Sequence, residues 1–147
     1  MTSAPTKIIK LSSLKADLQR EAAGDWIDFP DWPGVAFNVS SLHLPAYVTA
    51  RDLAMKMLQK QYGSATVPQA VLTAELGRLY ATHILHGWRG LDVPYSAADA
   101  MKTLSDPEFR NVVAAVEWCA AQVSQVQIQF VEVEAKNSAA PSATGSA

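Results

Sequence analysis

Apolar residues recur through most of the chain at intervals of three and four, which is the period of an α-helix. A first amphipathic helix is predicted to begin at Pro45 and to end before Gly63, because proline is tolerated in a first helical turn and glycine readily ends a helix. Its predicted apolar stripe consists of Tyr47, Ala50, Ala54, Met57 and Leu58.

A second helix is predicted to begin near Thr66, which can cap it, with Pro68 in its first turn. The helical period is kept by Leu72, Leu76, Leu79 and His83. Gly77 in its interior costs about 1 kcal/mol relative to alanine. Such a cost indicates close contact with a neighbouring backbone at Gly77.

Period two replaces the helical period before residue 40. Apolar Ile27 and Phe29 flank Asp28, and "PDWPG" supplies two prolines that forbid helix and a glycine that can turn. We predict a β-hairpin near residues 25–40, with Val35, Phe37 and Val39 facing the core. A short helix capped by Ser12 or Ser13 is predicted before it, within residues 11–23.

The run "HILHGWRGLDVPYSAADA", residues 83–100, is predicted to connect two helices, and we call it the joint. Gly87 and Gly90 can end the preceding helix, and Ser96 with Asp99 resembles a cap for a short helix, "SAADAMKTL". Asp106 then precedes a proline and a glutamate, a pattern that begins another helix.

The last predicted helix has the most regular pattern, a heptad seam sustained over more than three repeats. The seam consists of Phe109, Val112, Val116, Cys119, Val123, Val126, Phe130 and Val133. Its end, "VQIQFVEVE", also alternates and is rich in β-branched residues, which suits a strand. We favour a helix through residues 124–134 because the seam stays in phase, and the strand remains the alternative.

These elements predict a mainly α fold: a small helical domain with an N-terminal β-hairpin and a long C-terminal helix. The domain is expected to span residues 7–136, between a flexible leader at residues 1–6 and a flexible tail at residues 137–147.

Composition limits the function classes. Hydrophobic residues make up 49% of the 147 residues and charged ones 18%, as in a globular domain with a core. The formal net charge of -2 provides no excess of positive charge for nucleic acid. The sequence has one cysteine, which fits a reducing compartment, and no apolar run long enough to cross a bilayer. We expect a cytoplasmic location.

No constellation of residues points to catalysis. His83 and His86 would share one helix face, but their spacing suits no recognised metal site, so we read one as partly buried and the other as a surface residue. Cys119 occupies an inward seam position, where the pKa of a thiol rises and its reactivity falls. We expect no enzymatic activity, no metal, no cofactor and no small-molecule substrate.

The four tryptophans favour binding over catalysis, because tryptophan is enriched both in cores and at interface hot spots. Trp26 and Trp118 are predicted to anchor the core. Trp88 and Arg89, on the joint, are predicted to contact a partner.

Several of these segments, in order, resemble the tail assembly chaperones of long-tailed bacteriophages, prophages and gene-transfer elements. The quoted segments are "GDWIDFPDWPGVAFNVSSL", "PAYVTARDLAMKML", "ELGRLYATHILHGWRGL", "VPYS" and "LSDPEFRNVVAAVEWCA". The resemblance extends from about Leu11 to about Lys136, and its most distinctive part is the succession from "ILHGWRGL" through "PYS" to "DPEF".

The resemblance implies a small, mostly helical, non-enzymatic protein of the host bacterial cytoplasm. Such a chaperone binds the long tape-measure protein, keeps it soluble and helps to recruit tail-tube subunits. In this family a programmed ribosomal frameshift often yields a longer product. The predicted helices are compatible with this role. A tape-measure protein is expected to be long and helical, and its exposed apolar helix faces aggregate unless a partner with an apolar groove covers them.

Two partner-binding surfaces are predicted. The first is the end of the C-terminal seam, at Val126, Phe130 and Val133; the second is the joint, at Trp88, Arg89 and Tyr95. At the joint, Trp88 and Tyr95 could instead plug the core beneath the loop. Self-association through the seam also stays open.

Two other functions remain as alternatives. A structural tail or head-tail completion protein would be retained in the particle in stoichiometric amount. A small helical regulator that binds nucleic acid is disfavoured by the charge balance and by the lack of a basic recognition helix.

Overall fold

The structure, a computed structural model, describes residues 6–133. Within that range the chain forms two compact units, which we describe separately. The larger unit comprises residues 17–125, and the smaller one is built from the described residues before 17 and after 125.

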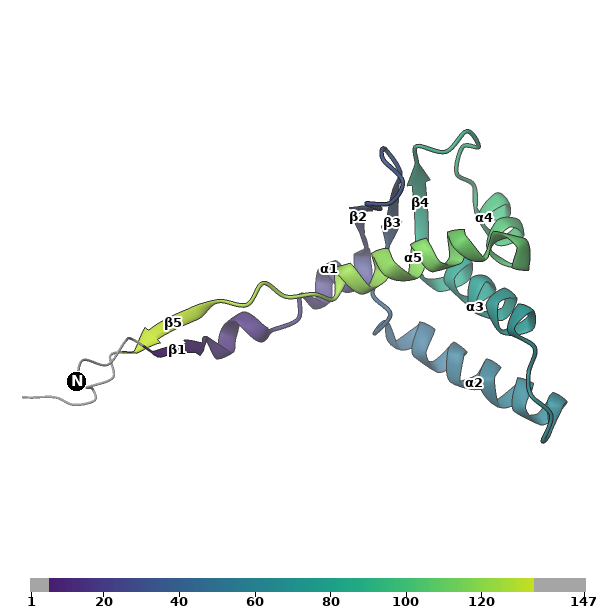
Figure 1. Cartoon of the computed structure of the whole chain (residues 1–147), viewed down its shortest axis with the longest axis horizontal. Helices are drawn as coiled ribbons and strands as arrows, with labels where there is room; N and C mark the ends of the chain where they lie inside the picture. Colours follow the sequence, from purple (N-terminus) through teal and green to yellow (C-terminus); the bar gives the residue numbers. More distant parts are fainter. Residues whose placement is uncertain (1–5, 134–147) are drawn as a thin grey trace, which may run out of the picture. The chain divides into compact units, whose positions relative to one another are not determined.

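The larger unit is mixed α/β (Figure 1). Its elements are α1 (Leu18–Ala23), β2 (Asp25–Asp28), β3 (Ala36–Val39), α2 (Pro45–Tyr62), α3 (Gln69–His83), β4 (Leu85–Arg89), α4 (Ala97–Leu104), the 3-10 turn η2 (Pro107–Phe109) and α5 (Arg110–Val123). The predicted hairpin is confirmed as β2 and β3, but the prediction of a mainly α fold is too helical. A third strand, β4, extends the hairpin to an antiparallel sheet in the order β2-β3-β4.

One face of this sheet belongs to the core. Ile27 pairs with Phe37, and Phe37 pairs with Trp88, so these three side chains share a face. Phe37 is fully buried and Trp88 is 7% exposed. α5 packs against β2 and β3, and its buried residues Val116 and Cys119 belong to the same core cluster (Figure 1).

β4 lies where the second predicted helix was expected to continue. α3 ends at His83, and the chain then alternates between buried Leu85 and exposed His86. His86 interrupts the pairing, because Asn38 pairs with Gly87 while the next residue of β3 pairs with Leu85. Pairing with β3, about fifty residues earlier in the chain, supplies the backbone hydrogen bonds that a strand needs. Gly87 is therefore a strand residue and does not end a helix.

The residues expected to begin and end helices are placed partly as predicted. Ser96 caps α4, because its Oγ accepts a hydrogen bond from the Asp99 N–H at 3.0 Å. Asp106 accepts one from the Glu108 N–H at 2.9 Å, which begins η2. Thr66 does not cap α3; Pro68 occupies the cap position without a side-chain hydrogen bond.

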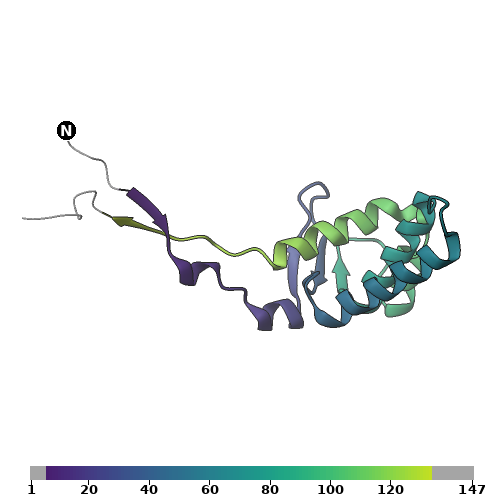
Figure 2. The ribbon, with the colours of Figure 1, turned by 90° about the horizontal axis from the view of Figure 1, so that it is seen from below.

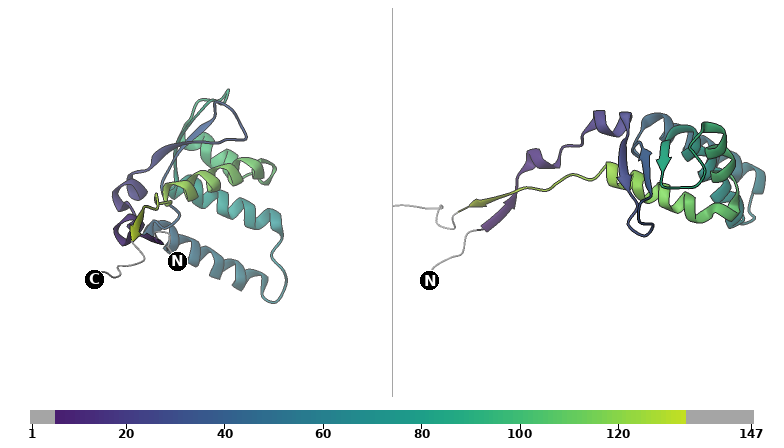
Figure 3. Two further views of the ribbon diagram at one scale, coloured as in Figure 1. Left: turned by 60° about the vertical axis from the view of Figure 1, so that its left-hand side comes forward. Right: turned by 90° about the horizontal axis from the view of Figure 1, so that it is seen from above.

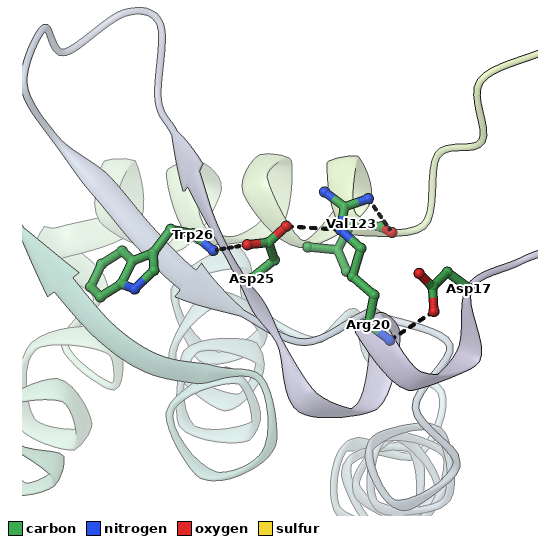
Figure 4. Close-up of polar contacts among 5 residues, drawn as sticks. All are labelled: Asp17, Arg20, Asp25, Trp26 and Val123. Atoms are coloured by element: carbon green, nitrogen blue, oxygen red, sulfur yellow. Dashed lines mark hydrogen bonds and ion pairs between the residues drawn. The ribbon is translucent and has the colours of Figure 1, made fainter.

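α1 is shorter than the predicted N-terminal helix and has a different cap. Asp17, and neither of the two predicted serines, accepts the Arg20 N–H at 3.1 Å (Figure 4). The Arg20 side chain donates from Nε to Asp25 Oδ2 at 2.9 Å and from its guanidinium to the Val123 carbonyl at 3.4 Å. Arg20 thereby connects α1 to β2 and to the end of α5.

The long C-terminal helix is a wrong prediction. α5 ends at Val123, and β5 (Phe130–Val133) follows in the smaller unit. Inside α5 the predicted seam is buried at Val116, Cys119 and Val123, whereas Phe109, before the helix, is 45% exposed.

The smaller unit is a two-stranded antiparallel ribbon with a 3-10 turn. It contains β1 (Thr6–Ile9), η1 (Leu11–Leu14) and β5, and β1 and β5 lie side by side (Figure 2). Thr6 pairs with Val133 and Ile9 with Phe130, and the Lys10 N–H donates to the Gln129 carbonyl at 2.8 Å. Every residue of both strands is exposed. The strand reading of the alternating "VQIQFVEVE" is thus correct for Phe130–Val133.

Candidate partner-binding surfaces

Trp88 and Tyr95, two of the predicted contact residues, pack together beneath the joint. The Trp88 Nε1–H donates to the Val93 carbonyl at 2.7 Å, and the two rings meet edge to face with centroids 5.3 Å apart. Trp88 is 7% exposed and belongs to the core cluster, against which Tyr95 packs. The structure therefore has the arrangement in which both rings plug the core.

Arg89 lies on the opposite face of β4. Its guanidinium lies 4.5 Å from the centroid of the Trp26 ring, a cation–π distance. Trp26 was predicted to anchor the core, yet it is 39% exposed and covers Gly87 on the outer face of the sheet. Trp118, predicted as a second core anchor, is also 39% exposed. The structure thus does not bring Arg89 together with Trp88.

A cleft of about 350 Å³ lies beside the joint, between the loop after β4, α4 and the start of α5. We call it the joint cleft, and its apolar lining consists of Trp88, Leu91, Val93, Phe109 and Val112. The exposed fractions of Leu91, Val93 and Phe109 are 37%, 46% and 45%. Sequence reasoning found the joint but selected Trp88, Arg89 and Tyr95, of which only Trp88 lines the cleft, instead of these three exposed residues.

The polar lining of the joint cleft is mainly acidic. Asp92, Asp99 and Asp106 contribute carboxylates, and Lys102 contributes an ammonium group. Three carboxylates against one ammonium group give the lining of the cleft an excess of negative formal charge.

Local contacts fix the walls of the joint cleft. Gly90 has a φ of +89°, and a Cβ there would come within 2.1 Å of the Gly34 carbonyl oxygen, so the loop begins against another backbone segment. The Trp88 hydrogen bond to Val93 holds the middle of the loop. The caps at Ser96 and Asp106 fix the start of α4 and of η2. The cleft is therefore formed before any partner binds.

A second hollow, of about 410 Å³, separates α2 from α3. The two helices lie side by side and are joined by the loop at their far ends (Figure 3, left). We call this hollow the helix groove, and its apolar lining consists of Ala50, Leu53, Ala54, Met57, Leu58 and Leu79. Leu53 is 59% and Met57 64% exposed, so part of the predicted core stripe of this helix faces the groove.

The rim of the helix groove is polar. Glu75 and Arg78 form an ion pair one turn apart on α3, and His83 lies at the end of the same helix. His86 is on β4, where its Nε2 lies 2.6 Å from the Ser40 hydroxyl, so the prediction that both histidines share one helix face is wrong.

The predicted seam surface at Val126, Phe130 and Val133 is not formed. Phe130 and Val133 are three positions apart on β5, so they lie on opposite faces of the ribbon. Val126 precedes the strand and is half-buried. Phe130 is 58% exposed and lies opposite Ile9, which is 47% exposed. Their predicted role in partner binding stays a prediction. The single helical face on which that prediction placed the three residues does not exist, because Phe130–Val133 is a strand.

Cys119 is placed as predicted. Burial, with a smaller contribution from the Asp28 carboxylate, raises the pKa of its thiol to about 11. The thiol therefore stays protonated at neutral pH, as expected for a structural cysteine. Within residues 6–133, no three acidic, histidine or cysteine side chains are grouped so that they could hold a metal ion. No helix among the described residues is long and apolar enough to cross a membrane.

Comparison with known protein families gives a match over most of the described chain. Residues 42–137, well over half of the chain, match the family described as YdaY prophage protein. The matched range includes α2 to α5, with both the helix groove and the joint cleft. No curated protein and no solved structure matches the chain.

Proposed function

Since the chain belongs to the YdaY prophage protein family, and so has a phage origin, we propose that it is a tail assembly chaperone. In this role it binds the tape-measure protein in the host cytoplasm, keeps it soluble and helps to recruit tail-tube subunits. The resemblance of the quoted segments to such chaperones supports this role, and the proposal assigns no catalytic step, cofactor or nucleic acid to the chain.

The helix groove is the observation that carries the proposal. Leu53 and Met57 are four positions apart on α2, so their side chains are neighbours on one face of the helix. Both are more than half exposed beside the small residues Ala50 and Ala54. An amphipathic helix can place its apolar face in a groove of this kind, and a flexible methionine adapts to different side chains.

The charged rim suits the same partner. Glu75 and Arg78 form an ion pair on α3, so the edge of the groove on that helix carries one negative and one positive group. A tape-measure protein is expected to be long and helical, with apolar faces that aggregate before the tube encloses them. The groove would cover one such face at a time and release it as tube subunits replace the chaperone.

The test is co-expression of this chain with the tape-measure protein encoded by the same element, followed by affinity pull-down and a solubility assay. Met57→Glu should lower the recovered tape-measure protein roughly tenfold, as for the loss of an interface hot spot. Gln59→Glu is the matched control, because Gln59 is exposed on the same helix but does not line the groove. It should leave recovery unchanged.

Two results would contradict the proposal. One is a tape-measure protein that is soluble without this chain and does not co-purify with it. The other is this chain in stoichiometric amount in purified particles, which would favour the structural tail or head-tail completion protein instead.

A further inference from the structure

We propose that the joint cleft is a second docking site, which takes a peptide segment of a partner protein with a large apolar side chain flanked by lysine or arginine. The proposal goes beyond the chaperone role. It rests on residues that the helix groove does not contain, so it stands whether or not the tape-measure protein occupies that groove.

The apolar part of the site comes from three separate elements. Leu91 and Val93 extend from the loop after β4, and Phe109 extends from η2, each between 37% and 46% exposed. Trp88 closes the base of the cleft and is held there by its hydrogen bond to the Val93 carbonyl. A large apolar side chain entering the cleft would bury these surfaces together, which favours binding by the hydrophobic effect.

The charge of the rim selects the flanking residues. Asp92 lies on the loop, Asp99 in the first turn of α4 and Asp106 before η2, so carboxylates stand on more than one side of the apolar base. Lys102 is the one basic residue of the lining. An anionic ligand would be repelled by this set, whereas lysine or arginine beside the inserted apolar side chain would be attracted.

Two of these carboxylates already have structural contacts, and these contacts keep them in place. Asp99 accepts a hydrogen bond from the Ser96 hydroxyl at 3.0 Å, and Asp106 accepts the Glu108 N–H at 2.9 Å. Asp92 is exposed on the loop and caps no helix. Asp92 is therefore the carboxylate whose replacement tests the charge with the least effect on folding.

The experiment measures fluorescence anisotropy of two dye-labelled peptides with the full-length chain. Both carry a central Leu-Phe pair, flanked by lysines in one peptide and by glutamates in the other. We expect the lysine peptide to bind at least roughly tenfold more tightly, with an affinity that falls as salt is added.

Variants assign that binding to the cleft. Asp92→Lys should lower the affinity for the lysine peptide roughly threefold to tenfold. The control is Asp31→Lys, which alters an exposed loop residue outside the cleft and should change this affinity less than about twofold. Leu91→Ser should also weaken it, and Leu18→Ser, which alters a leucine that is 74% exposed on α1, should not.

The proposal is overturned if the two peptides bind equally, if neither binds, or if each control weakens binding as much as its matched variant. It is also overturned if the chain associates with itself and occupies the cleft before any peptide is added. Met57→Glu should lose tape-measure binding and keep peptide binding, because Met57 does not line the joint cleft. Absence of peptide binding in a parent chain that still binds the tape-measure protein would be a failure of this site alone.

Discussion

Gly77 on α3 lies against the carbonyl oxygen of Leu104 at the end of α4. A Cβ at position 77 would be 1.7 Å from that oxygen, far inside van der Waals contact. The Val113 side chain would be 3.1 Å from the same Cβ, so the glycine is enclosed by two elements. The close backbone contact predicted from a glycine inside a helix is confirmed.

Gly77→Ala should lower the free energy of unfolding by about 2–4 kcal/mol, although alanine favours the helix by about 1 kcal/mol. The added methyl group meets backbone, which cannot rotate away. Urea unfolding followed by circular dichroism would measure the change. A variant as stable as the parent would contradict the contact.

Gly63→Ala is the matched comparison, because Gly63 ends α2 with a φ of +58° and a Cβ there would have no neighbour within 4 Å. The unfavourable factor for alanine is then the backbone conformation, φ +58° and ψ -124°, which costs a residue with a Cβ about 1–3 kcal/mol. Gly77 has no positive φ, so a loss of stability in Gly77→Ala measures the clash with neighbouring atoms, whereas a loss in Gly63→Ala measures backbone strain.

Trp88→Phe should destabilise the protein by about 1–3 kcal/mol, because phenylalanine loses the hydrogen bond to the Val93 carbonyl and leaves a cavity under the joint. Trp26→Phe should cost less than about 1 kcal/mol, because Trp26 is 39% exposed and lies on the outer face of the sheet. The same urea unfolding measures both. Equal losses would show that the two rings are equivalent in the core.

The tryptophans show where sequence reasoning stops. Local pattern does not distinguish a ring under a loop, such as that of Trp88, from a ring on the outer face of a sheet, such as that of Trp26. Trp26 covers Gly87, which is paired through β3 and lies about sixty residues later in the chain. That pairing, which local periodicity cannot detect, decides which face each ring occupies.

The elements that were predicted correctly depend on near neighbours. Pro45 begins α2, Gly63 ends it, and Ser96 caps α4 through residues within one turn. The strands that were missed or mistaken for helix are β1, β4 and β5, and they depend on distant partners: β5 pairs with β1 across more than a hundred residues. The heptad pattern predicted a helix through Phe130 because a local pattern carries no information about pairing with β1.

The candidate site was found in part for the same reason. The joint was identified from its turn residues, but its exposed lining, Leu91, Val93 and Phe109, follows from packing among three elements. Met57 was assigned to the core stripe of α2, but it lines the helix groove and is 64% exposed.

Arg20→Ala should destabilise the larger unit by about 1 kcal/mol. Arg20 and Asp25 are each partly exposed, which limits their ion pair to a fraction of that value. The second contribution is the hydrogen bond to the Val123 carbonyl at the end of α5 (Figure 4). A double-mutant cycle with Asp25→Ala separates the two, and a loss fully explained by the pair with Asp25 would exclude the contact with α5.

Cys119 should make the folded protein less stable as the pH rises above about 9. Burial raises the pKa of its thiol from 9.0 to about 11, so the folded state keeps a proton that the unfolded state has already released. The stabilising contribution is complete below pH 9 and is lost progressively between 9 and 11. Burial also raises the pKa of Tyr47 and Tyr80, but from a normal value of 10.0, so their effect begins at higher pH.

The measurement is the free energy of unfolding in urea at closely spaced pH values, with Cys119→Ala beside the parent. Alanine lowers stability at every pH because it leaves a small cavity, but it should flatten the decline between pH 9 and 10. A thiol-specific reagent should react with the native parent at neutral pH far more slowly than with the urea-unfolded chain, since the buried thiol is both protonated and inaccessible. Identical slopes for parent and variant, or rapid labelling of the native protein, would contradict the raised pKa.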